Sequence, residues 1–359
     1  MIQDSFLKSF RETKSPFIMN PFRFAAAGGG AVGGWVQLGR TTLGSAAATL
    51  GVASLADKRY YMVLCSAICS GTVFHNIQYN SDTGTNYSYR YSDNGGGDGT
   101  AGSSASTLHG APGSTTQSFS VGYTSNLAAK EKLVMAHGIS QSTAGAGTAP
   151  TRRETVGKWA NTSAAVNEID FSNGGGGNFN TNSEVVVLGW DPTDTHTTNF
   201  WEELASVELG SAGTVLSSGT FTAKKYLWVQ AFIDSSGGNV NDAFRCGNGS
   251  VDTGTNYSWR FSANGGSDST YTSQDDIGDF SNIANGQFIN MFIINNASNE
   301  KLITCHINEG KTGAGTAPTR LEIVGKWANT SDQINIVEWR NPASTNYSTK
   351  SIIKVWGSD

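Results

Sequence analysis

Four aspartates lie on glycine-rich segments whose residue types suit a hard cation. Asp82 opens the sequence DTGTNYSYRYSDNGG and Asp252 opens the similar DTGTNYSWRFSANGG, and Asp98 and Asp268 follow the second glycine cluster of each. Carboxylate and amide oxygens are the ligands that calcium prefers. The spacing lacks the D-x-[DN]-x-[DN]-G pattern with its closing glutamate, and Asp and Asn also stabilise hairpin turns. The four residues are therefore calcium candidates, with turn formation as the competing interpretation.

Two histidines, His137 and His306, occupy matching places 169 residues apart. A matched histidine could act as a general base. No Ser-His-Asp or Cys-His arrangement repeats around either of them, however, and Cys305 has Ala136 as its counterpart. We therefore interpret both histidines as ordinary strand residues.

The most closely repeated charged residues also suggest packing more than catalysis. Arg152, Glu154 and Lys158 alternate so that a strand would place them on one face. Glycoside hydrolysis would need a second carboxylate in register, and only Glu131 and its counterpart Glu300 repeat. We predict ion pairs between domains or subunits, no catalytic residues and no enzymatic activity.

Trp159 and Trp327 lie in the repeated sequence GKWANTS and admit two interpretations. Exposed tryptophans on a β-protein stack on sugars, so the pair are glycan-binding candidates. Alternating strands also direct large aromatic residues into the core. We expect the core position for both.

These residues belong to a tandem duplication. Residues 145–163, GAGTAPTRRETVGKWANTS, return 168 residues later as GAGTAPTRLEIVGKWANTS, and the two DTGTNYS segments lie 170 residues apart. A period of this length is that of a whole domain and not of a solenoid repeat. We predict an arm and glycine-rich linker at residues 1–34, one copy at 35–191, a linker at 192–200 and a second copy at 201–359.

Each copy reads as a series of short strands separated by turns. In the first copy the strand-like runs are WVQLGRTTL, YYMVLCSAI, NYSYRYS, QSFSVGYTS, EKLVMAHGIS, RETVGKWA and SEVVVLGW. The segment NFWEELASVELG resembles a helix start, but its counterpart GGWVQLGRTTLG is a strand pattern. We predict an all-β chain of two antiparallel β-sandwiches, and jelly-roll and concanavalin-like topologies both fit.

Composition excludes several functional classes. The net charge is -5, charged residues make up 15% of the chain, and no basic block occurs, which argues against nucleic acid as a partner. No apolar run approaches a membrane span. The four cysteines have no counterparts in the other copy, so we expect small, reduced core residues. We predict no cofactor other than the calcium considered above.

The arm is more apolar than a solvated tail requires. Of its five phenylalanines, we single out Phe6, Phe10, Phe17 and Phe22. We expect these side chains to dock the chain onto other subunits.

The DTGTNYS and NGG segments, the EKL sequences at Glu131 and Glu300 and the KWANTS segments resemble structural and fibre-type proteins of marine tailed bacteriophages. The resemblance covers both copies from Trp35 onward but not the arm. It implies a virion protein, either a capsid decoration protein or a receptor-binding fibre domain, and it identifies no catalytic residues.

Our leading hypothesis is a non-enzymatic virion structural protein, assembled in the host cytoplasm and docked by its arm onto copies of itself and other virion proteins. The alternative is a carbohydrate-binding receptor module that recognises a host surface glycan. A glycan-cleaving enzyme with one degenerate copy is the third hypothesis.

Overall fold

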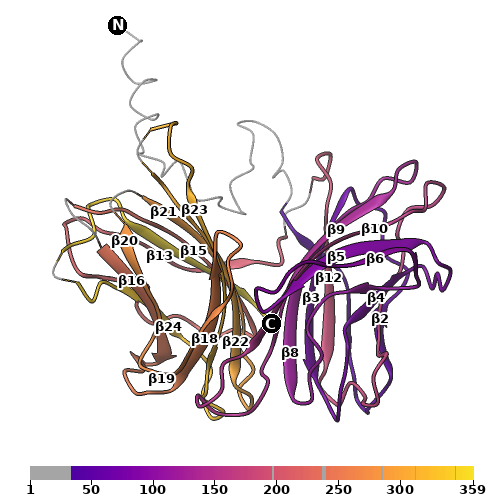
Figure 1. The fold of residues 1–359 in the computed structure, drawn as a ribbon, viewed down its shortest axis with the longest axis horizontal. Helices are drawn as coiled ribbons and strands as arrows, with labels where there is room; N and C mark the ends of the chain where they lie inside the picture. Colours follow the sequence, from indigo (N-terminus) through magenta and orange to yellow (C-terminus); the bar gives the residue numbers. More distant parts are fainter. Residues whose placement is uncertain (1–33, 196–197, 237–239, 284–285, 312, 344) are drawn as a thin grey trace, which may run out of the picture.

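The computed structural model describes residues 34–359 except 196–197, 237–239, 284–285, 312 and 344. The regular secondary structure of this described part consists of β-strands, and the part contains no helix that could cross a membrane (Figure 1). The all-β prediction is confirmed. The predicted docking residues Phe6, Phe10, Phe17 and Phe22 lie outside the described residues.

The first copy forms a large and a small antiparallel sheet. The large sheet has eight strands in the order β1-β12-β3-β8-β9-β10-β5-β6, and the small sheet has four in the order β2-β11-β4-β7. The strands of the large sheet are β1 (Val36–Thr42), β3 (Tyr60–Ile68), β5 (Tyr87–Asp93), β6 (Gly99–Ala105), β8 (Gln117–Ser125), β9 (Lys132–Ser140), β10 (Thr151–Trp159) and β12 (Glu184–Trp190). Those of the small sheet are β2 (Thr49–Val52), β4 (Asn76–Tyr79), β7 (Leu108–His109) and β11 (Ile169–Ser172).

The second copy repeats this arrangement. Its large sheet has the order β13-β25-β15-β21-β22-β23-β18-β19, and its small sheet has the order β14-β24-β16-β17 with β20 paired to β16. The large sheet contains β13 (Glu202–Glu208), β15 (Tyr226–Ile233), β18 (Tyr257–Ala263), β19 (Ser269–Gln274), β21 (Gln287–Ile294), β22 (Lys301–Glu309), β23 (Thr319–Trp327) and β25 (Ile352–Ser358). The small sheet contains β14 (Val215–Ser217), β16 (Val240–Asn248), β17 (Ser250–Val251), β20 (Ile277–Ile283) and β24 (Ile336–Arg340).

The strand registers confirm the duplication residue by residue. His137 pairs with Glu154 across β9 and β10, and His306 pairs with Glu322 across β22 and β23. Even the irregularities match, because β1 and β13 each shift register near their start, between Gln37 and Gly39 and between Glu203 and Ala205. The two copies can therefore be compared position by position.

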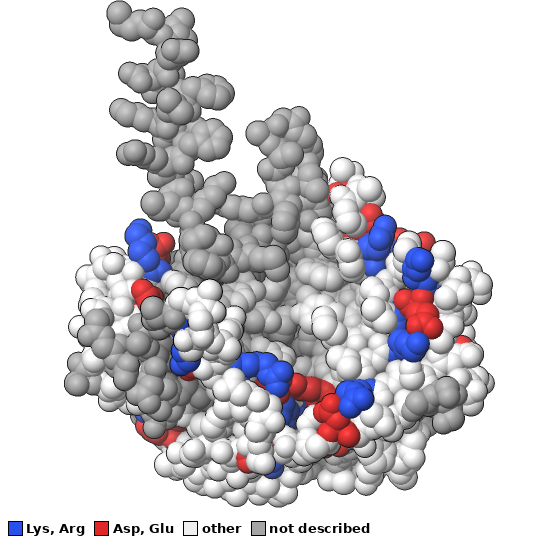
Figure 2. Space-filling model, turned by 45° about the horizontal axis from the view of Figure 1, so that its top comes forward, with Lys and Arg blue, Asp and Glu red and all other residues white. Residues whose placement is uncertain are grey.

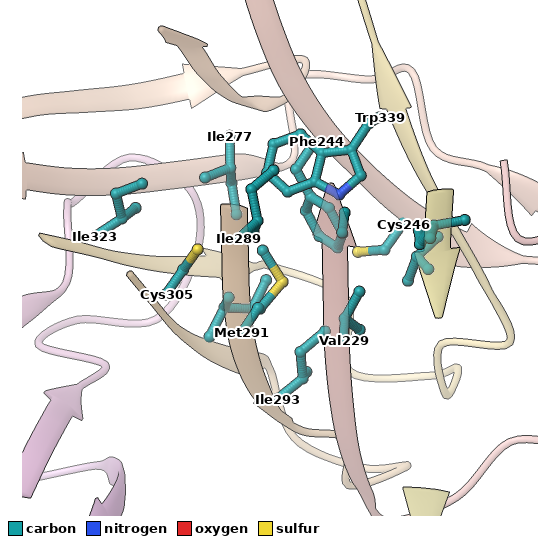
Figure 3. Close-up of a cluster of buried hydrophobic side chains, with 14 of the residues drawn as sticks. Val229, Phe244, Cys246, Ile277, Ile289, Met291, Ile293, Cys305, Ile323 and Trp339 are labelled. Carbon is teal, nitrogen blue, oxygen red and sulfur yellow. The ribbon is translucent and has the colours of Figure 1, made fainter. Parts of the chain in front are cut away.

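Each copy is a sandwich whose core lies between its large and small sheets. Side chains alternate across a strand, so every second residue of the large sheet points to the small one. In the second copy this core includes Val229, Phe244, Met291 and Trp339, all at most 1% exposed (Figure 3). Cys246 and Cys305 lie among them, and all four cysteines are buried and unbridged, as predicted.

A third apolar cluster lies between the two large sheets and joins the copies. On β3, Tyr61, Val63 and Cys65 face the core of the first copy, whereas Met62 and Leu64 face this joining cluster. A strand covered on both faces reads as a continuous apolar run, which explains the sequence YYMVLCSAI. The two domains stand side by side with their large sheets facing each other (Figure 1).

Candidate functional site between the two domains

The two large sheets contact each other at opposite ends. Each large sheet has one face that points away from its own small sheet and toward the other copy. On this face, the buried residues of the first copy lie toward one end of the strands, and those of the second copy lie toward the opposite end. Leu302 and Val324 are fully buried, whereas their counterparts Leu133 and Val156 are 58% and 53% exposed. Conversely, the side chain of Arg152 is 1% exposed and that of its counterpart Arg320 is 60% exposed. The sheets therefore form a wedge that is closed on one side and open on the other.

The closed side is held by the hairpin loop between β9 and β10. The amide of Gly145 donates to Glu300, and Lys326 of the second copy donates to the carbonyl oxygens of Gln141 and Thr143. The Pro150 carbonyl accepts from Nε of Arg260 at 2.8 Å. The corresponding residues of the second copy's loop that are described, 313–318, are exposed.

Polar side chains gather where the wedge begins to open; we call His137, Arg152, Glu154, His306 and Glu322 the seam cluster. Arg152 Nη1 donates to Oε2 of Glu322 at 2.9 Å and lies 3.0 Å from Oε1 of Glu154. Its Nη2 donates to Oδ1 of Asp268 at 2.7 Å. Figure 2 shows acidic and basic side chains intermingled between the two domains. The predicted ion pairs between domains are confirmed for Arg152.

The two matched histidines meet within the seam cluster. Their ring centroids lie 4.4 Å apart, with His137 buried and the His306 side chain 47% exposed. Nε2 of His306 lies 3.3 Å from Oε1 of Glu154, and Nε2 of His137 lies 3.8 Å from the same oxygen. The interpretation of these histidines as ordinary strand residues was incomplete, because each strand places its histidine on the face that meets the other copy.

The surroundings alter the protonation of this cluster. Burial lowers the pKa of His137 well below its usual value, and the neighbouring His306 acts in the same direction. Burial would raise the pKa of Glu154, but the hydrogen bond from His306 and the further effect of the neighbouring groups outweigh burial, so that this pKa is lowered. Burial and the adjacent Glu154 raise the pKa of Glu322.

The open side of the wedge is an apolar hollow on the first copy. Its cavity volume is about 950 Å³. We define the hollow by six of the large side chains that line it, which are Trp35, Tyr60, Leu133, Met135, Val156 and Trp190. A second cavity of about 570 Å³ adjoins it and is lined by the seam cluster. The hollow could accept an apolar ligand or protein segment, and the adjoining cavity gives solvent access to the histidines.

The tryptophans of the GKWANTS segments are core residues, as expected. Trp159 is 1% exposed and Trp327 is 2% exposed. Each indole Nε1 donates to the aspartate of its own copy, Asp82 at 2.7 Å and Asp252 at 2.8 Å. No sugar can stack on these rings, so the glycan-binding interpretation of this pair is wrong.

The aspartates form turns and ion pairs. Besides the tryptophan, Asp82 accepts from the Gly84 amide and the Asn86 side chain, and Asp252 repeats this pattern in the second copy. Asp98 is paired with Arg90, and Asp268 accepts from Arg152. Their oxygens are thus already directed at N–H donors, which favours the turn interpretation over calcium.

The remaining predicted charges, Lys158 and Lys326, differ between the copies. Lys158 pairs with Glu131 at 2.8 Å on an exposed surface of its own copy. Lys326 is buried at the closed side of the wedge, 3.7 Å from Glu300. Identical residues therefore serve one copy as surface charges and the other as interdomain contacts.

Comparisons with known proteins add little to this geometry. Neither a protein-family model nor a curated protein matches the chain. Among solved structures, the mouse laminin alpha1 chain, domains LG4-5, is similar at 11% sequence identity, covering 90% of this chain and 88% of that chain with a TM-score of 0.19. A TM-score this low supports no inference about what the present chain binds.

Proposed function

We propose that this chain is a non-enzymatic structural protein that assembles with other protein chains through the hollow, and that its place is in a phage virion. The observation that carries the proposal is the exposed apolar wall of the hollow. Leu133 and Met135 are each 58% exposed on a sheet whose equivalent face in the second copy is covered. Contiguous exposed apolar surface on a soluble protein marks an interaction site.

The segment that we propose for the hollow is the N-terminal arm of a neighbouring copy of this chain. Trp35, which follows the arm in the sequence, lines the hollow. The arm carries the four phenylalanines that the sequence analysis singled out. Burying one phenylalanine contributes about 1.5–3 kcal/mol, so several together offset the entropy of ordering the segment.

The assignment to a virion rests, in addition, on the resemblance of the sequence to phage structural and fibre-type proteins. The seam cluster does not argue against a structural role, because Arg152 in this cluster forms ion pairs with Asp268 and Glu322 that join the two copies. Structural virion proteins need surfaces that bind other chains, and the hollow is such a surface.

A charge placed in the hollow tests the proposal. In the full chain, Val156→Asp should abolish attachment to particles or to other copies, because the carboxylate would have to be buried beside apolar groups. Val215→Asp is the matched control, since Val215 is also exposed, on the second copy's small sheet. Sedimentation velocity and particle co-sedimentation would measure both. Unchanged association of Val156→Asp would contradict the proposal.

A carbohydrate-binding receptor module remains the second candidate, now on different residues. Tyr60 and Trp190 stack with ring centroids 5.4 Å apart on the wall of the hollow, and Tyr60 is exposed. Exposed aromatic rings of this kind bind sugar faces. A glycan array would distinguish the two functions: saturable binding that Tyr60→Ala removes would favour the receptor module.

A further inference from the structure

Three side chains of the seam cluster direct donor atoms at one point between the domains. His137, Glu154 and His306 each offer one atom, and these atoms all lie within 4.8 Å of one another. They come from three strands and both copies. Nothing in the proposed assembly role requires this arrangement.

We propose that His137, Glu154 and His306 bind a zinc ion that bridges the two copies. Two imidazoles and one carboxylate are a common zinc ligand set. Ligands at about 2.1 Å from a tetrahedral zinc lie roughly 3.4 Å from one another. The carboxylate oxygen Oε1 of Glu154 is already 3.3 Å from Nε2 of His306 and 3.8 Å from Nε2 of His137. Binding therefore needs only small movements of the side chains.

An unsatisfied buried atom is independent support for a missing partner. Nε2 of His137 is buried and has no hydrogen-bond partner among the described residues. Buried polar atoms are rarely left unpaired, and each exception calls for a specific explanation, such as an ion. A metal ion bound at this nitrogen would satisfy it.

Arg152 is the main obstacle, because its guanidinium lies 3.0 Å from the same carboxylate oxygen. Its charge is matched elsewhere, by Glu322 at 2.9 Å and Asp268 at 2.7 Å. Glu154 is therefore not required to neutralise Arg152, and a carboxylate has lone pairs for both an arginine and a metal ion. Arg152 therefore lowers the affinity of the site for zinc but does not prevent Glu154 from binding the ion.

The site is also accessible. The cavity of about 570 Å³ is lined by all three ligands, and His306 is half exposed toward it. A fourth position on the zinc ion is thus left for a water molecule.

Isothermal titration calorimetry of the full chain with zinc alone would test the proposal. We expect one zinc ion per chain, and affinity about 100-fold weaker in both His306→Ala and Glu154→Gln, because each removes a ligand. His306→Ala changes a half-exposed residue and should leave the fold intact, which circular dichroism would check. His109→Ala is the control, since His109 lies on β7 of the small sheet.

Each outcome decides the matter. Stoichiometric binding that is lost in both ligand variants and kept in His109→Ala supports the zinc site. No binding in the full chain overturns it, and so does equal affinity in the wild type and His306→Ala. Because the experiment measures zinc and not association, its result is independent of the assembly proposal.

Discussion

The two copies contain nearly the same sequence from Gly145 to Ser163 and from Gly313 to Ser331, yet they bury opposite ends of it. Val156 is exposed where Val324 is buried, and Arg152 is buried where Arg320 is exposed. The environment of a residue here depends on which side of the wedge its copy presents. The comparison teaches that the interface between the copies, and not the local sequence, decides which residues are exposed and able to bind a ligand or partner.

The two core tryptophans should show the largest effects and should not distinguish the copies. Both are buried and both hydrogen-bond an aspartate of their own copy. Trp159→Ala and Trp327→Ala should each lower the free energy of unfolding by about 3–5 kcal/mol. Urea denaturation would measure this, and a difference above about 2 kcal/mol would show that the two cores are not equivalent.

The paired arginines should separate the copies clearly. Arg152→Ala leaves buried carboxylates without their partner and should cost about 3–5 kcal/mol. Arg320→Ala removes an exposed side chain and should cost about 0–1 kcal/mol. The same denaturation experiment checks both variants. Similar losses would mean that the wedge is closed on both sides or on neither.

Two buried titratable residues, one at the same position in each copy, should affect the pH dependence of folding stability in opposite directions. His75 lies just before β4 and Asp242 lies within β16, at equivalent positions of the two small sheets, and both are fully buried. Burial lowers the pKa of His75 to about 3 and raises the pKa of Asp242 to about 7. Because His75 resists protonation in the folded chain, the folded protein loses stability as the pH falls below the pKa of this residue in the unfolded chain, about 6.5. Folded Asp242 resists ionisation, so it stabilises below about pH 4 and loses that stability as pH rises through 7.

The contributions of His75 and Asp242 have opposite slopes between pH 4.5 and 6.5 and nearly cancel each other, whereas other groups contribute equally to the parent chain and to both variants. Relative to the parent chain, His75→Asn should therefore shift the pH dependence toward greater stability on acidification. Asp242→Asn should shift it in the opposite direction. Urea midpoints at the two pH values measure each slope, and equal slopes in both variants would contradict the assignment.

The smallest expected difference concerns the paired valines. Val324→Ala removes buried methyl groups from the joining cluster and should cost about 1–2 kcal/mol. Val156→Ala changes an exposed residue and should stay within about 0.5 kcal/mol. Thermal unfolding would be sensitive enough to detect the difference.

Much of this architecture could be predicted from the sequence. All seven strands predicted in the first copy are found, and all belong to its large sheet. The duplication also identified NFWEELASVELG correctly, since it forms β13. The strands of the small sheet were missed, because runs of four residues or fewer, such as β2 and β4, carry too little alternation to stand out from turns.

The candidate site could not be predicted in the same way. The repeat showed that His137 and His306 are equivalent, but equivalence does not place two residues next to each other. Their meeting depends on how the two large sheets are oriented, and that orientation follows from apolar surface spread over many strands. The hollow was missed for the same reason, since the exposed Leu133 has the same residue type as its buried counterpart Leu302.

Chemical labelling of the two equivalent lysines tests the wedge most directly. Lys158 and Lys326 lie in the same GKWANTS sequence, yet the side chain of Lys158 is 43% exposed and that of Lys326 is fully buried. Acetylation of the native chain, followed by mass spectrometry of the peptides that contain ETVGK and LEIVGK, would report both rates from one sample. The wedge predicts that Lys158 reacts at least about tenfold faster than Lys326, because a buried amine must wait for local opening. Equal rates would contradict the asymmetric packing of the two copies.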